Sequence, residues 1–218
     1  MDLKEAMETR SSTRVFLNKK VEKEVVEELI SVASRAPSAL NLQPWEVVIV
    51  AGEEKQRLSN VVSRAYSEHE VPCGPGAVKK MPKEFYERQR ESLAKMEPFI
   101  NEAGFDDFNA FVNEGSCRFY EAPVAVLIFL DDSHSERRMI CIGVFLGYLL
   151  LAARSLGLGT CPIGIINPYG HEIKEFLNVP EEKELMVGIG LGYPDPDSPV
   201  NRVSTERVDL NKSAKWVY

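Results

Sequence analysis

Apolar residues recur at helical spacing through several parts of this chain. Leu3, Ala6 and Met7 follow the i, i+3, i+4 pattern of a short first helix. The same spacing continues from residue 21 to residue 33, and Pro37 ends the helical pattern soon after. The other helices that we expect cover residues 53 to about 66, 79–96 and 139–156, with a further short helix around Phe105, Phe108 and Phe111.

The segment 139–156 is apolar on nearly every side, whereas segment 79–96 is highly charged and has little apolar face. A helix that borders water keeps polar residues on that side, so we expect segment 139–156 to be buried all round. In a chain of 218 residues, this favours a central helix that a second subunit partly covers.

Three continuous apolar runs predict buried strands at residues 45–51, 123–130 and 185–192. Several helices and few strands indicate an α+β fold. A Pro- and Gly-rich break lies at residues 72–76, but no repeat or clear linker divides the chain, so we expect one domain over residues 1–218. An arm at about 195–218 ends in Trp216 and Tyr218, which favours a tail docked on another surface.

Composition excludes several classes of function. The net charge of −7 disfavours a nucleic-acid surface or a polybasic membrane anchor, and the apolar run 123–130 is too short to span a bilayer. The first residues carry no apolar signal region, and the four cysteines form no CxxC pair, so we expect a cytoplasmic protein with reduced thiols. His69, His134 and His171 lack metal-ligand spacing, and no metal is expected.

Two glycine clusters, at residues 157–164 and 188–192, invite a dinucleotide-binding interpretation that their context contradicts. The first follows a predicted helix, and the second follows a strand but leads into PDPDSP rather than a helix. The dinucleotide fingerprint needs a strand, a glycine turn and a helix in that order, so that phosphate meets a helix amino terminus. A nucleotide cofactor would therefore have to be bound by other means.

Four segments carry residue types that suit phosphate or a flat ligand. Residues 9–14 read TRSSTR, where arginine and serine supply strong donors, and residues 36–45 read APSALNLQPW. Residues 156–164 read LGLGTCPIG, where glycines allow a ligand close to the backbone, and Arg202 and Arg207 lie in the arm. Taken alone, the first segment is more often a solvated cap, the second is more often a helix-to-strand turn, and the other two have the alternatives of a helix cap with a loop and of exposed charges.

Taken together and in this order, the four segments resemble the nitroreductase family over nearly the whole chain. TRSSTR is similar to the family's RRSxR-like motif, PSALNLQPW to Pro-Ser-Ser-x-Asn-x-Gln-Pro-Trp, and LAARSLGLGT to LAAxxLGLGT; a GYP turn and a late arginine follow. Two positions depart from this pattern. Ala39 replaces a common serine, and Ser11 stands where many members carry arginine or histidine.

The resemblance implies an interlocked homodimer with a mixed, mostly antiparallel sheet wrapped by helices, a tail that crosses to the partner, and FMN at the subunit interface. NADH or NADPH would be the co-substrate. Arg14 would stabilise the reduced flavin, and the residues 37, 38, 39 and 41 would come from the other subunit. The residues implied to bind the cofactor are Arg10, Ser11, Ser12, Arg14, Pro37, Ser38, Ala39, Asn41, Pro162, Ile163, Gly164, Arg202 and Arg207.

The activity implied by the resemblance is hydride transfer from NAD(P)H to a small electron-poor acceptor, a nitroaromatic or a quinone, in ping-pong turnover. Open alternatives are a flavin reductase, a reductive dehalogenase of the same fold, or a flavin-binding protein without turnover. A lid insertion is expected at about 72–113. Asn41, Phe105, Phe108 and Phe111 are the candidate substrate contacts, and the alternative for the phenylalanines is a small cluster that packs only against itself.

Overall fold

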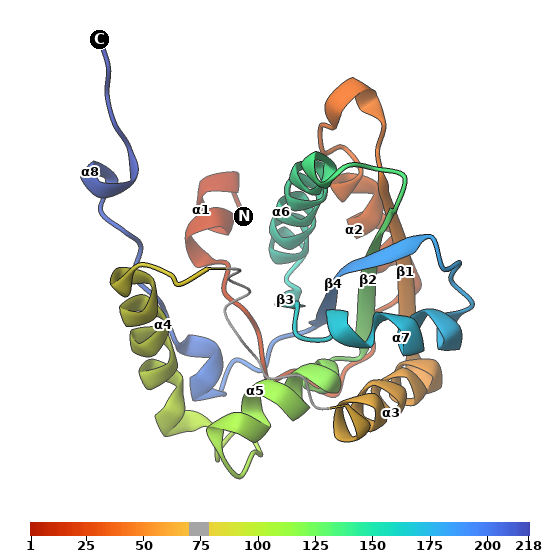
Figure 1. The fold of residues 1–218 in the computed structure, drawn as a ribbon. Coiled ribbons are helices and arrows are strands. Elements are labelled where there is room, and N and C mark those ends of the chain that lie inside the picture. Colours follow the sequence, from red (N-terminus) through yellow and green to blue (C-terminus); the bar gives the residue numbers. More distant parts are fainter. Residues whose placement is uncertain (70–78) are drawn as a thin grey trace.

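A four-stranded antiparallel sheet lies at the centre of the protein, in a computed structural model that describes residues 1–69 and 79–218. The strand order is β1-β2-β4-β3 (Figure 1). The predicted break at 72–76, Cys73 and the start of the expected lid at 72–78 lie outside the described residues. The strands are β1 (Trp45–Ala51), β2 (Val124–Asp131), β3 (Gly159–Ile163) and β4 (Lys183–Gly192).

Helices cover both faces of this sheet, which confirms the α+β class. On β2, Val126 and Ile128 point into one core with α2 and α6, while Leu127 and Phe129 point into the other with α3, α5 and α7. The helices are α1 (Leu3–Thr9), α2 (Lys23–Ala33), α3 (Gly52–Glu68), α4 (Lys83–Met96), α5 (Phe108–Cys117), α6 (Met139–Ser155), α7 (Gly170–Leu177) and α8 (Leu210–Ser213).

Strand β3 and helix α7 are elements that the sequence pattern did not predict. Strand β3 occupies part of the segment interpreted as a glycine loop, and Pro162 is tolerated there because β4 is the one strand of the described residues that pairs with β3, which lies at the sheet edge. Helix α7 carries Ile173, Phe176 and Leu177 at helical spacing, a signal that was present in the sequence. It ends at Asn178, whose φ of 52° is the left-handed conformation common after helices.

Helix α6 is not buried all round within one chain, so its burial on every side depends on the expected second subunit and stays a prediction. Phe145 and Leu149 are fully buried, but Ile140 is 73% exposed and Tyr148 is 43% exposed. Together with the turn before it, the helix is also long and apolar enough to cross a membrane. The sequence analysis considered only the shorter apolar run 123–130 for this role. Core helices of globular proteins share that composition, and α6 packs on α2 and the sheet.

The end of the chain leaves the body of the molecule beyond α8 (Figure 1). Trp216 is 68% exposed, and Tyr218 is fully exposed. The two rings stack on each other at a centroid distance of 6.4 Å. The expected docking of this tail therefore does not occur on its own chain.

The glycines of β4 make room for a turn formed by residues 119–121. A Cβ atom at Gly190 would lie 2.7 Å from the backbone oxygen of Phe119, and one at Gly188 would lie 3.0 Å from the Phe119 ring. All three residues of the turn have positive φ, between 50° and 55°. Such a backbone is strained for residues other than glycine and persists only where its surroundings hold it. The cluster at 188–192 thus serves packing.

Gly190→Ala should lower the free energy of unfolding by about 2–3 kcal/mol, because the new methyl group must displace a backbone carbonyl in a close-packed region. Gly170→Ala is the matched control. Gly170 has a helical φ of −60°, and its Cβ would lie an ordinary 3.6 Å from Leu185. Urea unfolding of both variants measures the difference, and wild-type stability of Gly190→Ala would contradict this account of β4.

Candidate functional site

The segment of residues 9–14 runs from the end of α1 along the edge strand β3. Ser12 forms a parallel bridge with Thr160, and the Thr13 amide donates to the Thr160 carbonyl at 2.9 Å. A Cβ atom at Gly159 would lie 2.9 Å from the Cβ of Thr13. Gly159 was predicted to let a ligand approach the backbone, but the space beside it is filled by Thr13 of the same chain.

Asn201 fixes the other side of this segment, and the sequence analysis did not identify it. Its Oδ1 accepts from the Arg14 amide at 2.9 Å and from the Val15 amide at 3.2 Å. Its Nδ2 donates to the carbonyls of Val15, at 2.7 Å, and Asp195, at 3.0 Å. The Asn201 side chain thus joins residues 14 and 15, which precede it by 187 and 186 positions, to the start of the arm at Asp195.

These contacts place a cavity of about 900 Å³ beside the segment. Its second wall comes from α4, through Ser92 and Met96, and from the arm beyond Asn201. The predicted cofactor residues on its lining are Arg10, Ser11, Ser12, Arg14, Arg202 and Arg207. The structure therefore brings together the first and last of the four segments recognised in the sequence.

The cavity carries net positive charge, because its lining holds four arginines and one carboxylate, that of Glu8. Burial lowers the pKa of Arg10, and the charge of Arg207 lowers it further. Within residues 1–69 and 79–218, neither Arg10 nor Arg14 forms an ion pair. Guanidinium groups held close together without carboxylates form an anion-binding site, because a bound anion offsets both their repulsion and their desolvation.

Arg202 and Arg207 differ from these two in their contacts. Arg202 donates to the carbonyl of Pro196 at 2.8 Å and lies 3.7 Å from the carboxylate of Asp197. Arg207 donates to the Thr205 carbonyl at 2.9 Å. Both side chains are exposed, and Arg202 serves the structure of the arm as well as the rim of the cavity.

The remaining predicted cofactor residues do not line this cavity in one chain. Pro37, Ser38, Ala39 and Asn41 lie in the connection from α2 to β1, where Asn41 has a φ of 55° and the Ser38 hydroxyl accepts from the Gln43 amide at 2.9 Å. The other three, Pro162, Ile163 and Gly164, end strand β3 and follow it, just beyond Thr160, the residue that pairs with Ser12. Their contact with a cofactor stays a prediction.

Two of the predicted substrate residues lie in the core. Phe111 is fully buried and Phe105 is 9% exposed, and their rings meet edge-on at 5.3 Å. Both pack with residues of α3 and the sheet, so they form neither a lid surface in this conformation nor a separate cluster. Phe108 is half-buried beside them. Within the expected lid insertion, α4 rather than α5 supplies the wall of the cavity.

The arrangement defines a class: an α+β protein with a half-buried, cationic cavity suited to an anionic organic ligand. Within the described residues, no group of three His, Cys, Asp or Glu side chains could hold a metal ion. The model of the nitroreductase family matches residues 7–193. The chain therefore belongs to the nitroreductase family.

Individual relatives agree with this assignment. The chain is 29% identical to a chloronitrobenzene nitroreductase of Comamonas testosteroni, over 96% of this chain and 94% of the relative. It is 32% identical to an iodotyrosine deiodinase of Thermotoga neapolitana, over 87% of each. The structure of the FMN-dependent nitroreductase NfnB from Mycobacterium smegmatis in complex with NADPH is 26% identical, covers 100% of both chains and has a TM-score of 0.87.

Asn201→Ala should cost about 2–3 kcal/mol of unfolding free energy, because it leaves part-buried backbone groups of residues 14, 15 and 195 without their partner. Asn101→Ala is the control, since Asn101 is exposed on the surface. Urea unfolding gives both values. If the two variants were equally stable, Asn201 would not be the link that holds the segment 9–14 in place.

Proposed function

We propose that this protein is an FMN-dependent oxidoreductase that transfers hydride from NADH or NADPH to a small electron-poor acceptor, a nitroaromatic or a quinone, in ping-pong turnover. The observation that carries the proposal is the pair of guanidinium groups, Arg10 and Arg14, which form no ion pair with any described residue and line a cavity of about 900 Å³. Membership of the family supports it, as does the likeness to an FMN-dependent enzyme whose structure contains NADPH.

The residues on the cavity fit the two ends of FMN. Arg10 and Arg207 lie close enough that the charge of Arg207 lowers the pKa of Arg10, as expected of two groups that share one phosphate. The hydroxyls of Ser11 and Ser12 supply further donors beside them. Arg14 is set deeper, against the aromatic residues of the core, and suits the electron-accepting end of the ring.

FMN, when bound, supplies the redox chemistry, and the chain supplies binding, orientation and charge. Cys117 is no candidate nucleophile, because burial raises the pKa of its thiol to about 11. Since residues 37–41 and 162–164 do not reach the cavity in one chain, we propose that residues 37, 38, 39 and 41 of a second copy close the site, with residues 162–164 of the first copy at the ring.

The purified protein should be yellow and should release FMN rather than FAD on denaturation, which chromatography of the released cofactor decides. Anaerobic reduction with NADH or NADPH, followed by a panel of oxidants, then identifies the acceptor. Rapid reoxidation by nitroarenes or quinones supports the proposal. Reoxidation by free flavin or by a halogenated tyrosine instead would assign one of the other activities of this fold, and no reduction by either nucleotide would indicate binding without turnover.

Arg10→Ala and Arg207→Ala should each weaken FMN binding about tenfold to a hundredfold, the loss expected for one charge-assisted bond to a partly buried phosphate. The apo fold should be unaffected, as judged by thermal unfolding. Arg57→Ala is the matched control, since Arg57 pairs with Glu54 on the exposed side of α3. Titration of the apo variants with FMN measures the affinities. Unchanged affinity in both site variants would place the phosphate elsewhere.

We also propose that the protein is a homodimer, with the carboxyl-terminal tail and an exposed apolar row of α6, formed by Met139, Ile140 and Tyr148, as contacts. Large apolar surfaces of this kind are typical of permanent interfaces. Light scattering at low concentration should give twice the chain mass of 24.5 kDa. Ile140→Glu should shift the equilibrium towards monomer, whereas Glu136→Gln on the turn before α6 should not. A flavin-loaded wild-type monomer would contradict the proposal.

A further inference from the structure

Two aromatic rings surround the inner side of the Arg14 guanidinium. Its Cζ atom lies 5.9 Å from the centroid of the Tyr120 ring and 6.0 Å from that of Phe111. The two rings meet at 5.6 Å and 61°, so they form a corner. A guanidinium within about 6 Å of an aromatic face is attracted by its quadrupole, more strongly where water is excluded.

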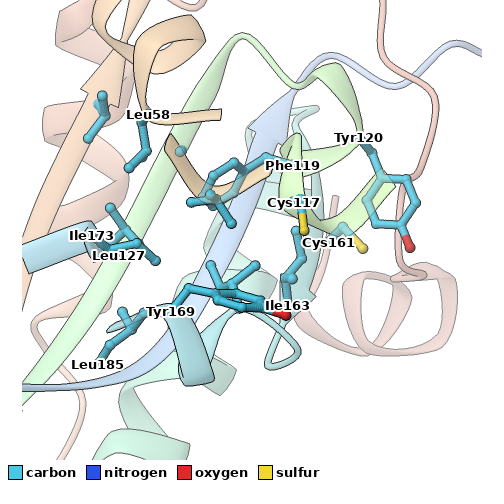
Figure 2. Close-up of a cluster of buried hydrophobic side chains, with 14 of the residues drawn as sticks. Leu58, Cys117, Phe119, Tyr120, Leu127, Cys161, Ile163, Tyr169, Ile173 and Leu185 are labelled. Carbon is cyan, nitrogen blue, oxygen red and sulfur yellow. The ribbon is translucent and has the colours of Figure 1, made fainter. Parts of the chain in front are cut away.

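Tyr120 owes its position to an unusual backbone. It is the middle residue of the strained turn 119–121, in which successive side chains point to opposite sides. In Figure 2, the rings of Phe119 and Tyr120 lie on opposite sides of the turn, and both belong to the same core cluster. The glycines of β4 admit Phe119, and the turn then presents Tyr120 towards Arg14.

The buried Lys55 contacts both ends of this turn. Lys55 of α3 is 4% exposed, donates to the carbonyl of Arg118 at 2.9 Å and lies 3.7 Å from the carboxylate of Glu121. Burial lowers the pKa of Lys55, against the opposing effect of Glu121. A buried ammonium that bonds a backbone carbonyl is costly to displace, so the turn is anchored at both ends.

We propose that Tyr120 is a positioning residue that holds the Arg14 guanidinium towards the cavity and so favours the reduced form of the bound cofactor. The inference rests on the proposed function. The Asn201 side chain fixes the backbone of Arg14, and the aromatic corner fixes its side chain. Burial raises the pKa of Tyr120, while the nearby Arg14 guanidinium lowers it, so the hydroxyl stays neutral and the ring keeps its attraction for the cation.

The test compares the affinities of apo-protein variants for oxidised and reduced FMN. Reduced FMN carries additional negative charge, so a displaced Arg14 weakens its binding more than that of oxidised FMN. Tyr120→Leu and Tyr120→Met should lower the preference for reduced FMN about tenfold, which is about 30 mV in the midpoint potential of a two-electron couple. Tyr120→Phe keeps the ring and should stay within about twofold of wild type.

Two controls separate positioning from general loss of packing. Phe129→Leu removes an aromatic ring from the same core, on β2, and should leave the preference unchanged. In an Arg14→Met background, Tyr120→Leu should have no further effect on the preference, because residues that act through one another are not additive. Additive effects, or an unchanged preference in the foldable Tyr120 variants, would overturn the proposal.

A readout without flavin distinguishes failure of this inference from failure of the proposed function. In the apo protein, ring currents should shift the side-chain Nε–H resonance of Arg14, which is assigned by its loss in Arg14→Met. Tyr120→Leu should return that resonance towards the position of an exposed arginine. A wild-type protein that shows the shift but binds no FMN would refute the proposed function alone. An unshifted resonance in the wild type would refute the positioning role directly.

Discussion

The attachment of residues 9–14 to the edge of the sheet is the constraint on which the candidate site depends. Thr13 is buried against Gly159, and Asn201 bonds the backbone on both sides of residue 15. Alternate side chains of an extended segment point to opposite sides, so burial of Thr13 turns Ser12 and Arg14 to the cavity. Without these contacts, the arginines near the amino terminus and those of the arm would not share one cavity.

Strained backbone occurs twice among the residues that matter most for the proposed function. Residues 40 and 41 form one left-handed stretch, and residues 119–121 form another. Left-handed conformations cost free energy in residues other than glycine and must be maintained by surrounding contacts. At 119–121 the structure shows those contacts, since Gly188 and Gly190 leave space on one side and Lys55 bonds the turn on the other.

The exposed side of α6 and the incomplete cavity have a common explanation in the proposed homodimer. One chain leaves an apolar row on α6 uncovered, and it leaves residues 37–41 away from the arginines that they were expected to join. A second copy would cover the row and supply the missing residues. The same argument applies to Trp216 and Tyr218, which remain exposed beside the described residues of their own chain.

The sequence by itself determined the family, the α+β class and most elements, because helical and extended spacing of apolar residues is local information. It also predicted that Arg10, Arg14 and Arg207 belong to one site, and in the structure all three line the same cavity. Strand β3 and the cavity wall contributed by α4 were decided only by tertiary structure. Pro162 is acceptable in a strand only at a sheet edge, and an edge is defined by neighbours distant in sequence. Tyr120 is placed beside Arg14 by glycines some seventy residues later, a contact that no local pattern encodes.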